Sequence, residues 1–151
     1  MSTKDYAITF TVTQSPEEVF DAIANVRGWW SEEITGDTNR MGAQFTFQYR
    51  DLHRTTQKIT EFTAGQKVVW SVVESEIGFV VDRAEWLGTQ VVFEISRKGN
   101  RTELRFEHIG LVPAIECYEG CSGAWDFYIG KSLHGLITTG RGQPNRATAA
   151  A

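Results

Sequence analysis

His108 is the residue of this chain best suited to chemistry by its type and position. It follows Leu104 and Phe106 at every second position, so in a strand its imidazole shares a face with two apolar side chains. A histidine that faces an apolar pocket can act as a general base or hold a ligand by a hydrogen bond. A lone histidine near a strand end is more commonly hydrogen-bonded within the fold, so we assign no catalytic residue. His53 and His134 are expected to be solvated.

Other patterns that carry chemistry are missing from the sequence. There is no glycine-rich phosphate loop after a strand, no GxSxG, no HExxH and no paired CxxC. The two cysteines, Cys117 and Cys121, lie four residues apart, where a disulfide would be strained and would close almost no loop. Tetrahedral zinc needs four ligands, and no histidine has the spacing to complete them. We therefore expect buried free thiols, no metal and no cofactor.

A helix from about Cys117 to Leu136 would bring polar groups to an apolar interior. At 100° per residue one face collects Tyr118, Cys121, Trp125, Tyr128, Ile129, Ser132 and Leu136, and the other collects Phe127, Lys131 and His134. The first face must meet the rest of the fold, and its hydroxyl groups need partners when buried. A small apolar space with a few polar groups is typical of a ligand pocket, although a filled core would show the same stripe.

The N-terminal third predicts a strand and two helices. Tyr6 to Thr13 alternates between apolar and polar residues, as in a half-buried strand. Ser15 is a good N-cap, followed by proline at the first helical position and Glu18 to complete a capping box, and this helix ends at Arg27-Gly28. A short second helix is expected over 29–34, then a polar loop over 35–40. Because adjacent residues of one helical turn diverge, we expect one of Trp29 and Trp30 to line a cavity and the other to cover its rim.

The middle of the chain predicts an antiparallel meander. Successive strands place apolar residues at every second position: Phe45, Phe47 and Tyr49; a strand over 53–62; Val68, Trp70 and Val72; Val91, Phe93 and Ile95. The last of these opposes Leu104, Phe106 and His108 across a two-residue turn at Gly99-Asn100. The conformation of residues 77–88 is left open, because the segment does not alternate cleanly.

The length and the net charge of the chain limit the classes of protein to which it can belong. A chain of 151 residues fits one domain, which we place at residues 1–140, with a disordered tail over 141–151. The chain has 15 basic and 19 acidic side chains. The resulting net charge of −4 argues against nucleic acid and anionic membranes as partners. No apolar run is long enough for a signal peptide or a membrane span, so a cytoplasmic location is expected.

The order of these elements resembles the helix-grip fold of the SRPBCC/START (Bet v 1-like) superfamily. The resemblance is carried by ITFTVTQSPEEVFDAI at 8–23, Gly28-Trp29-Trp30, TELRFEHIGL at 102–111 and ECYEGCSGAW at 116–125. It is greatest to the branch named after the C-terminal domain of the activator of Hsp90 ATPase. The resemblance implies an α+β fold in which a curved antiparallel sheet wraps around a long C-terminal helix, with two short N-terminal helices and a hydrophobic cavity between sheet and helix. Some relatives only bind lipids, polyketides or other apolar molecules, and others catalyse cyclisation or dehydration.

Three functions are compatible with this resemblance. The first is binding of an apolar, aromatic or lipid-like small molecule by residues that share the inward parity: Trp30, Phe45, Phe47, Tyr49, Trp70, Phe93, Phe106, His108, Trp125 and Tyr128. The second is a cyclase or dehydratase-like enzyme that uses His108 with Tyr49 or Tyr128 as proton donor. The third is an interaction module with a chaperone partner, which ranks lowest because the namesake works with a larger N-terminal domain that these residues do not contain. Both a monomer and a homodimer remain open.

Overall fold

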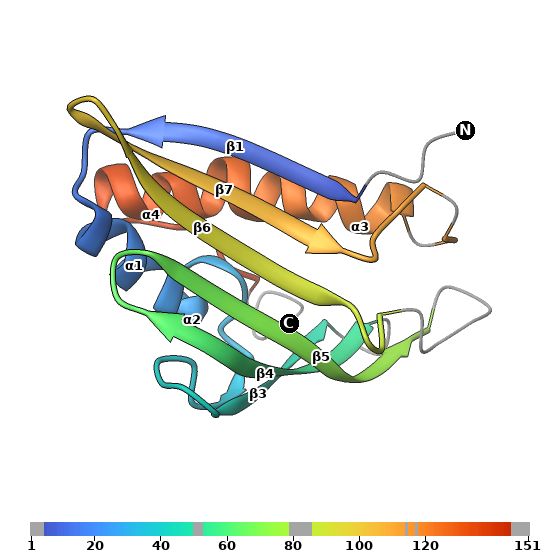
Figure 1. Cartoon of the computed structure of the whole chain (residues 1–151). Helices are drawn as coiled ribbons and strands as arrows, with labels where there is room; N and C mark the ends of the chain where they lie inside the picture. The colour runs from blue at the N-terminus through green and yellow to red at the C-terminus, as the bar shows by residue number, and fades with distance from the viewer. Residues whose placement is uncertain (1–4, 50–52, 79–85, 114, 117, 146–151) are drawn as a thin grey trace.

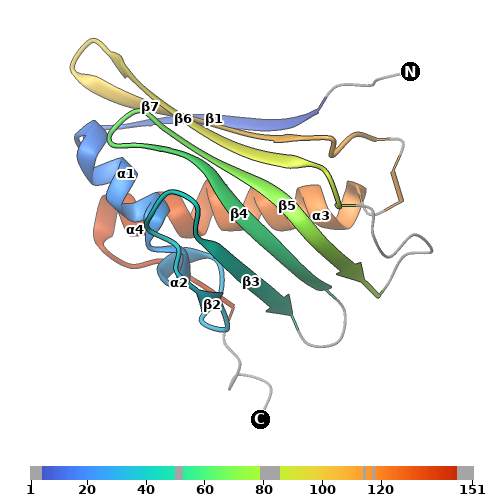
Figure 2. The same ribbon diagram turned by 60° about the horizontal axis from the view of Figure 1, so that its bottom comes forward.

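The computed structural model describes residues 5–49, 53–78, 86–113, 115–116 and 118–145. They form a seven-stranded antiparallel sheet in the order β1-β7-β6-β5-β4-β3-β2, crossed on one face by the C-terminal helix (Figures 1 and 2). The predicted α+β helix-grip fold is therefore confirmed. The elements are β1 (Tyr6–Val12), α1 (Pro16–Ala24), α2 (Val26–Trp29), β2 (Thr35–Gly36), β3 (Gln44–Tyr49), β4 (His53–Thr63), β5 (Lys67–Ile77), β6 (Gln90–Lys98), β7 (Arg101–Ile109), α3 (Tyr118–Phe127), the π-helical segment η1 (Tyr128–Leu133) and α4 (His134–Thr139).

Local sequence signals explain the start of α1 and the β6–β7 hairpin. The Ser15 hydroxyl accepts a hydrogen bond from the Glu18 amide at 3.1 Å, and the Glu18 carboxylate accepts one from the Ser15 amide at 3.0 Å, which confirms the capping box. Gly99 has a φ of 65°, the left-handed conformation that a two-residue hairpin turn requires. The register then pairs Phe93 with Phe106, as predicted.

Two irregularities bend the long strands of the sheet. The pairing of β4 with β5 shifts register between Thr56 and Gln57 and again between Ile59 and Glu61. Each extra residue increases the local twist, so the sheet curves around the helix instead of lying flat against it. Figure 2 shows the resulting twist, in which β1 runs nearly along the helix while β3, β4 and β5 run obliquely to it.

Helix α2 differs from the predicted second helix over 29–34. It begins at Val26 and ends at Trp29, because Ser31 leaves the helix to pair with Asn145 in a parallel bridge. The Asn145 amide donates to the Trp30 carbonyl at 2.9 Å, and the Glu32 amide donates to the Asn145 carbonyl at 2.8 Å. The described part of the expected disordered tail, residues 141–145, is thus held against the fold; residues 146–151 lie outside the described residues.

The C-terminal helix contains a π-helical segment that the sequence pattern did not predict. Its buried apolar side chains fall at every fourth residue: Cys121, Trp125, Ile129, Leu133 and Ile137. An α-helix at 100° per residue would rotate this series away from the sheet, but the i→i+5 pattern of η1 puts more residues into a turn. Cys121, Trp125, Ile129 and Ser132 are buried as predicted, but in the last turn Ile137 is buried instead of Leu136.

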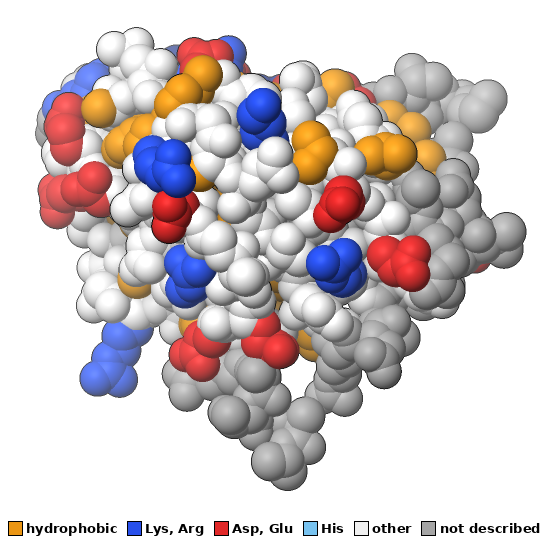
Figure 3. Space-filling model, turned by 90° about the horizontal axis from the view of Figure 1, so that it is seen from below, with side chains coloured by type: hydrophobic (Ala, Val, Ile, Leu, Met, Phe, Trp, Pro, Cys, Tyr) orange, Lys and Arg blue, Asp and Glu red, His pale blue; other side chains and the backbone are white. Residues whose placement is uncertain are grey.

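The surface of the described residues is mixed in charge. On the face seen from below, basic and acidic side chains are interspersed among polar ones (Figure 3). Among the described residues, no helix has both the length and the apolar character needed to cross a membrane.

Candidate functional site

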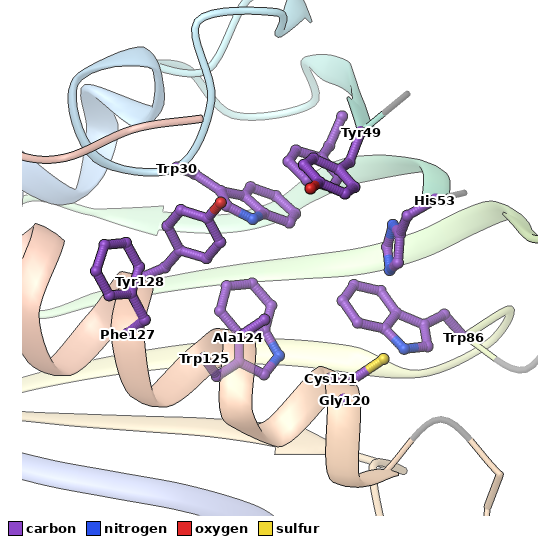
Figure 4. A pocket seen from close by; sticks show the side chains of 11 residues that line it. Trp30, Tyr49, His53, Trp86, Gly120, Cys121, Ala124, Trp125, Phe127 and Tyr128 are labelled. Atoms are coloured by element: carbon purple, nitrogen blue, oxygen red, sulfur yellow. The ribbon is translucent and has the colours of Figure 1, made fainter. Parts of the chain in front are cut away.

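A cavity of about 370 Å³ lies between the β3–β4 part of the sheet and helix α3. It is flanked on two sides by aromatic side chains that point toward one another (Figure 4), and it opens to the surface beside the exposed Gly120 and Ala124. Its lining consists of Trp30, Phe47, Tyr49, His53, Trp86, Gly120, Cys121, Ala124, Trp125, Phe127 and Tyr128.

The walls of the cavity are mostly flat rings. Trp30 stacks on Phe47 with ring centres 4.1 Å apart and an angle of 5° between the planes. Trp86 and Trp125 lie nearly parallel at 5.9 Å and 19°. Such surfaces favour a flat apolar ligand, since an offset-stacked aromatic pair adds about 0.5–1.5 kcal/mol beyond the area that it buries.

Both adjacent tryptophans are buried, so the expectation that one of them covers the rim was wrong. Trp29 is 0% and Trp30 3% exposed, and their rings lie side by side at 6.2 Å. Trp29 continues into the core, where it stacks on Trp70 at 6.2 Å, whereas Trp30 faces the cavity. Because α2 is a single turn that ends here, the chain directs both indoles to the same concave face of the sheet.

His108 is fully buried behind the cavity and is held by two hydrogen bonds. The Trp125 indole N–H donates to its Nδ1 at 3.1 Å. Its Nε2 lies 2.8 Å from the Thr89 hydroxyl, which itself donates to the Trp86 carbonyl at 2.6 Å. Since that hydroxyl proton is already used, Nε2 must carry the proton and donate it to Thr89.

This arrangement argues against the predicted roles of His108 as general base or as a contact for the ligand, and neither role is tested by it. Both nitrogens are occupied, and burial, with the nearby His53, lowers the pKa of His108 to about 3. The imidazole is neutral at pH 7, and its acceptor nitrogen is blocked by an indole N–H that does not ionise. His108 therefore acts on the cavity indirectly, by fixing the orientation of the Trp125 indole.

His53 was expected to be solvated, and this expectation was wrong. It is 9% exposed, lines the cavity, and contacts Phe47 and Trp86 edge to face at 5.3 and 4.5 Å. Burial lowers the pKa of His53 to about 4, so it is neutral at pH 7. Its Nδ1 is buried and finds no hydrogen-bond partner among the described residues.

His134, the third histidine, was also expected to be solvated. It is half-buried instead, and its ring contacts Phe10 edge to face at 5.0 Å on the other side of the helix from the cavity.

Two tyrosines bring hydroxyl groups to the cavity from opposite sides. Tyr49 comes from β3 and Tyr128 from the helix, and both are half-buried. Burial, followed by the proximity of Tyr49, raises the pKa of Tyr128, so its phenol stays protonated. Both side chains contribute hydrogen-bonding hydroxyls to the lining, but the pair offers no charged acid or base.

The predicted site residues on the concave face of the sheet fall into two groups, those that line the cavity and those that do not. Trp30, Phe47, Tyr49, Trp125 and Tyr128 line the cavity. Phe45, Trp70, Phe93, Phe106 and His108 do not: they are 0–1% exposed and belong to the packed core. Parity along a strand places a residue on the inner face, but only neighbouring elements decide whether the space above it is filled. That any of these residues binds a ligand remains a prediction.

Sequence reasoning missed several lining residues. Trp86 belongs to the segment whose conformation was left open, and residues 79–85 lie outside the described part of the chain. His53 could have been found, because it opposes Tyr49 directly once the β3–β4 pairing is known. Phe127 was assigned to the outer face of the helix, yet it also lines the cavity, next to the start of η1.

The described lining carries no charge at neutral pH. It contains no Asp, Glu, Lys or Arg, and its single imidazole is neutral. Within the described residues, no three His, Cys, Asp or Glu side chains gather as a metal site would require. Cys121 is buried at the cavity, while Cys117 lies outside the described residues, so the state of the two thiols remains a prediction.

Comparison with known proteins shows similarity at the level of structure. No family model matches the chain, and no curated protein matches it. The Aha1 dimer from Colwellia psychrerythraea superposes with a TM-score of 0.73 at 21% identity, over 93% of this chain and 100% of that one. CalU16 from Micromonospora echinospora gives 0.62 at 18% identity, over 88% and 74%. DynU16, from the dynemicin biosynthetic locus, gives 0.63 at 14%, over 90% of this chain and 48% of that one.

At these identities the likenesses show the fold. They agree with the helix-grip fold that the sequence resemblance implied. The same scaffold therefore carries proteins of different context, and the function of this chain must be argued from its own cavity.

Proposed function

We propose that this protein binds a compact, uncharged, aromatic small molecule in the cavity between β3, β4 and α3. The observation that carries the proposal is that a space of about 370 Å³ persists among large aromatic side chains, while the same face of the sheet is fully packed nearer α1. A cavity of this size lined by rings is therefore a candidate binding site.

The size of the cavity limits the ligand. Pockets for small molecules span roughly 300–1,000 Å³, so this one is near the lower end. An engineered apolar cavity of about 150 Å³ holds one benzene, which suggests room for about two to three rings here.

The electrostatics of the lining limit the ligand further. A charged group placed here would lose its hydration without meeting an opposite charge. A long lipid or a carboxylate is therefore disfavoured relative to a neutral polycyclic molecule, which narrows the class that the sequence predicted.

The two alternative functions receive less support from the site. The enzyme hypothesis relied on His108, whose nitrogens are both engaged. The chaperone-partner hypothesis finds no residue-level support in the cavity. The dimeric Aha1 structure, similar over its whole length, supports a homodimer of this chain, and light scattering on purified protein distinguishes it from a monomer. The cytoplasmic location remains a prediction from the sequence.

Native and denaturing mass spectra of the purified protein test the proposal first. A stoichiometric additional mass that is lost on denaturation supports it and identifies the ligand class. In parallel, the protein is titrated with N-phenyl-1-naphthylamine, an uncharged three-ring probe whose fluorescence rises in apolar surroundings. Saturable binding of one probe per chain is expected.

A variant that fills the cavity provides the control. Ala124 lines the cavity at an exposed position, so a tryptophan there can cover the opening and Ala124→Trp should abolish probe binding, whereas Thr139→Trp, outside the lining in the last turn of the same helix, should not. Equal probe binding by wild type and Ala124→Trp would show that the probe binds elsewhere and would overturn the proposal.

A further inference from the structure

The two buried histidines beside Trp86 differ in whether their ring nitrogens have hydrogen-bond partners. Both rings meet the Trp86 indole edge to face, His53 at 4.5 Å and His108 at 4.6 Å. His108 has a hydrogen-bond partner for each nitrogen. His53 has a buried Nδ1 for which the described residues supply no partner. Buried polar atoms are nearly always satisfied in folded proteins, so the exception needs an explanation.

The position of His53 explains why its Nδ1 has no partner. It is the first residue of β4 and lies directly opposite Tyr49 of β3, so its ring belongs to the inner face that lines the cavity. In Figure 4 His53 and Trp86 close one end of the cavity and Tyr128 the other. The imidazole is thus the polar group at an otherwise aromatic end of the site.

We infer that His53 determines the specificity of the cavity by accepting a hydrogen bond at Nδ1 from a hydroxyl group on the aromatic ligand, as in a phenol or naphthol. This inference rests on the proposed function and names the ligand class more closely. Nδ1 is enclosed in the structure, so the ring must turn about its Cβ–Cγ bond for Nδ1 to meet a group in the cavity. The neutral state that burial imposes leaves one ring nitrogen unprotonated and able to accept.

The chemistry explains why a hydroxyl and not an anion is selected. A phenolic O–H donates one hydrogen bond and brings no charge into a lining that has none to offer. A ligand without the hydroxyl would leave Nδ1 unsatisfied and bind more weakly.

Two probes that differ by one group test the inference. The dissociation constants of 2-naphthol and naphthalene are measured by displacement of N-phenyl-1-naphthylamine at pH 7.5. The wild type should prefer 2-naphthol about fivefold to tenfold, the usual effect of one net hydrogen bond. In His53→Phe, which keeps a ring and removes both nitrogens, the preference should fall below about twofold.

Two further variants separate recognition from packing. His53→Asn keeps an acceptor atom at the position of Nδ1 and should restore part of the preference. His134→Phe makes the same ring exchange outside the cavity lining and should retain all of it. Circular dichroism verifies the fold of each variant.

The outcomes distinguish this inference from the proposed function. If both probes bind the wild type with equal affinity, or if the preference survives in His53→Phe, the role of His53 is overturned while the cavity remains a binding site. If neither probe binds the wild type, the proposed function fails and this inference fails with it.

Discussion

Replacing each buried histidine by phenylalanine should change stability in opposite directions. In His108→Phe the Trp125 indole N–H loses its acceptor in a fully buried place, and the Thr89 oxygen loses a donor. A buried group left unsatisfied costs about 1–3 kcal/mol, and the second lost hydrogen bond adds about 1 kcal/mol. We therefore expect His108→Phe to lower the free energy of unfolding by about 2–4 kcal/mol.

His53→Phe removes an unsatisfied nitrogen instead of creating one. Its Nδ1 makes no hydrogen bond to the described residues, and the ring borders a cavity that can accept the slightly larger phenyl group. The variant should be more stable than the wild type by about 1 kcal/mol, because the desolvation cost of the orphaned nitrogen disappears. A gain in stability at the expense of binding is common where a residue serves function.

Urea unfolding followed by tryptophan fluorescence and circular dichroism measures both effects. At pH 7.5 both histidines are neutral in the folded state, with pKa values of about 4 and 3, and mostly neutral when unfolded. Ionisation therefore contributes little to the comparison. If His108→Phe proves as stable as the wild type, or if His53→Phe loses as much stability as His108→Phe, the contrast between a satisfied His108 and an unsatisfied His53 is refuted.

A double-mutant cycle isolates the energy of the hydrogen bond from the Trp125 indole to His108. With Trp125→Phe in place there is no N–H left to orphan, so His108→Phe should cost about 1–2 kcal/mol less than it does alone. Additive effects of the two substitutions would contradict the Trp125–His108 hydrogen bond.

Further predictions concern pH and two serines. The depressed pKa values of His53 and His108 mean that below pH 6.5 the unfolded chain binds more protons than the folded one. The free energy of unfolding, measured with urea, should therefore fall from pH 6.5 toward pH 5 by up to about 1.4 kcal/mol per pH unit for each histidine, and His53→Phe should lose about half of this dependence. Ser132→Ala should destabilise by about 1–3 kcal/mol in the same assay, because the buried hydroxyl donates to the Trp29 carbonyl and accepts from the Gln143 amide, and an unchanged midpoint would argue against both bonds. Ser15→Ala should cost about 1 kcal/mol through loss of the helix cap, whereas Ser15→Asp should cost little.

The similarity of fold with the Aha1, CalU16 and DynU16 structures leaves the cavity as the feature to compare. In this chain the lining owes its character to Trp30, Trp86 and Trp125, and Tyr49, His53 and Tyr128 add polar atoms to it. Because a fold hosts many functions, a shared scaffold predicts the place of a site better than its ligand.

The sequence by itself determined the elements and their inward faces. The capping box at Ser15, the glycine turn at Gly99 and the alternation through Phe106 are local signals, each satisfied by residues within a few positions along the chain or across one hairpin. Such short-range rules predict which side of a strand is buried. These rules were sufficient to predict the fold class and the register of the last hairpin.

Only the tertiary structure decided where packing stops and a cavity begins. Phe47 and Phe93 have the same inward parity, but Phe93 is covered by Trp29 and Trp70, whereas Phe47 borders open space. Both histidines likewise face inward, yet only His108 meets an indole N–H. These outcomes depend on which side chains arrive from α2 and α3, elements distant in sequence, so no periodicity along a single strand could predict them.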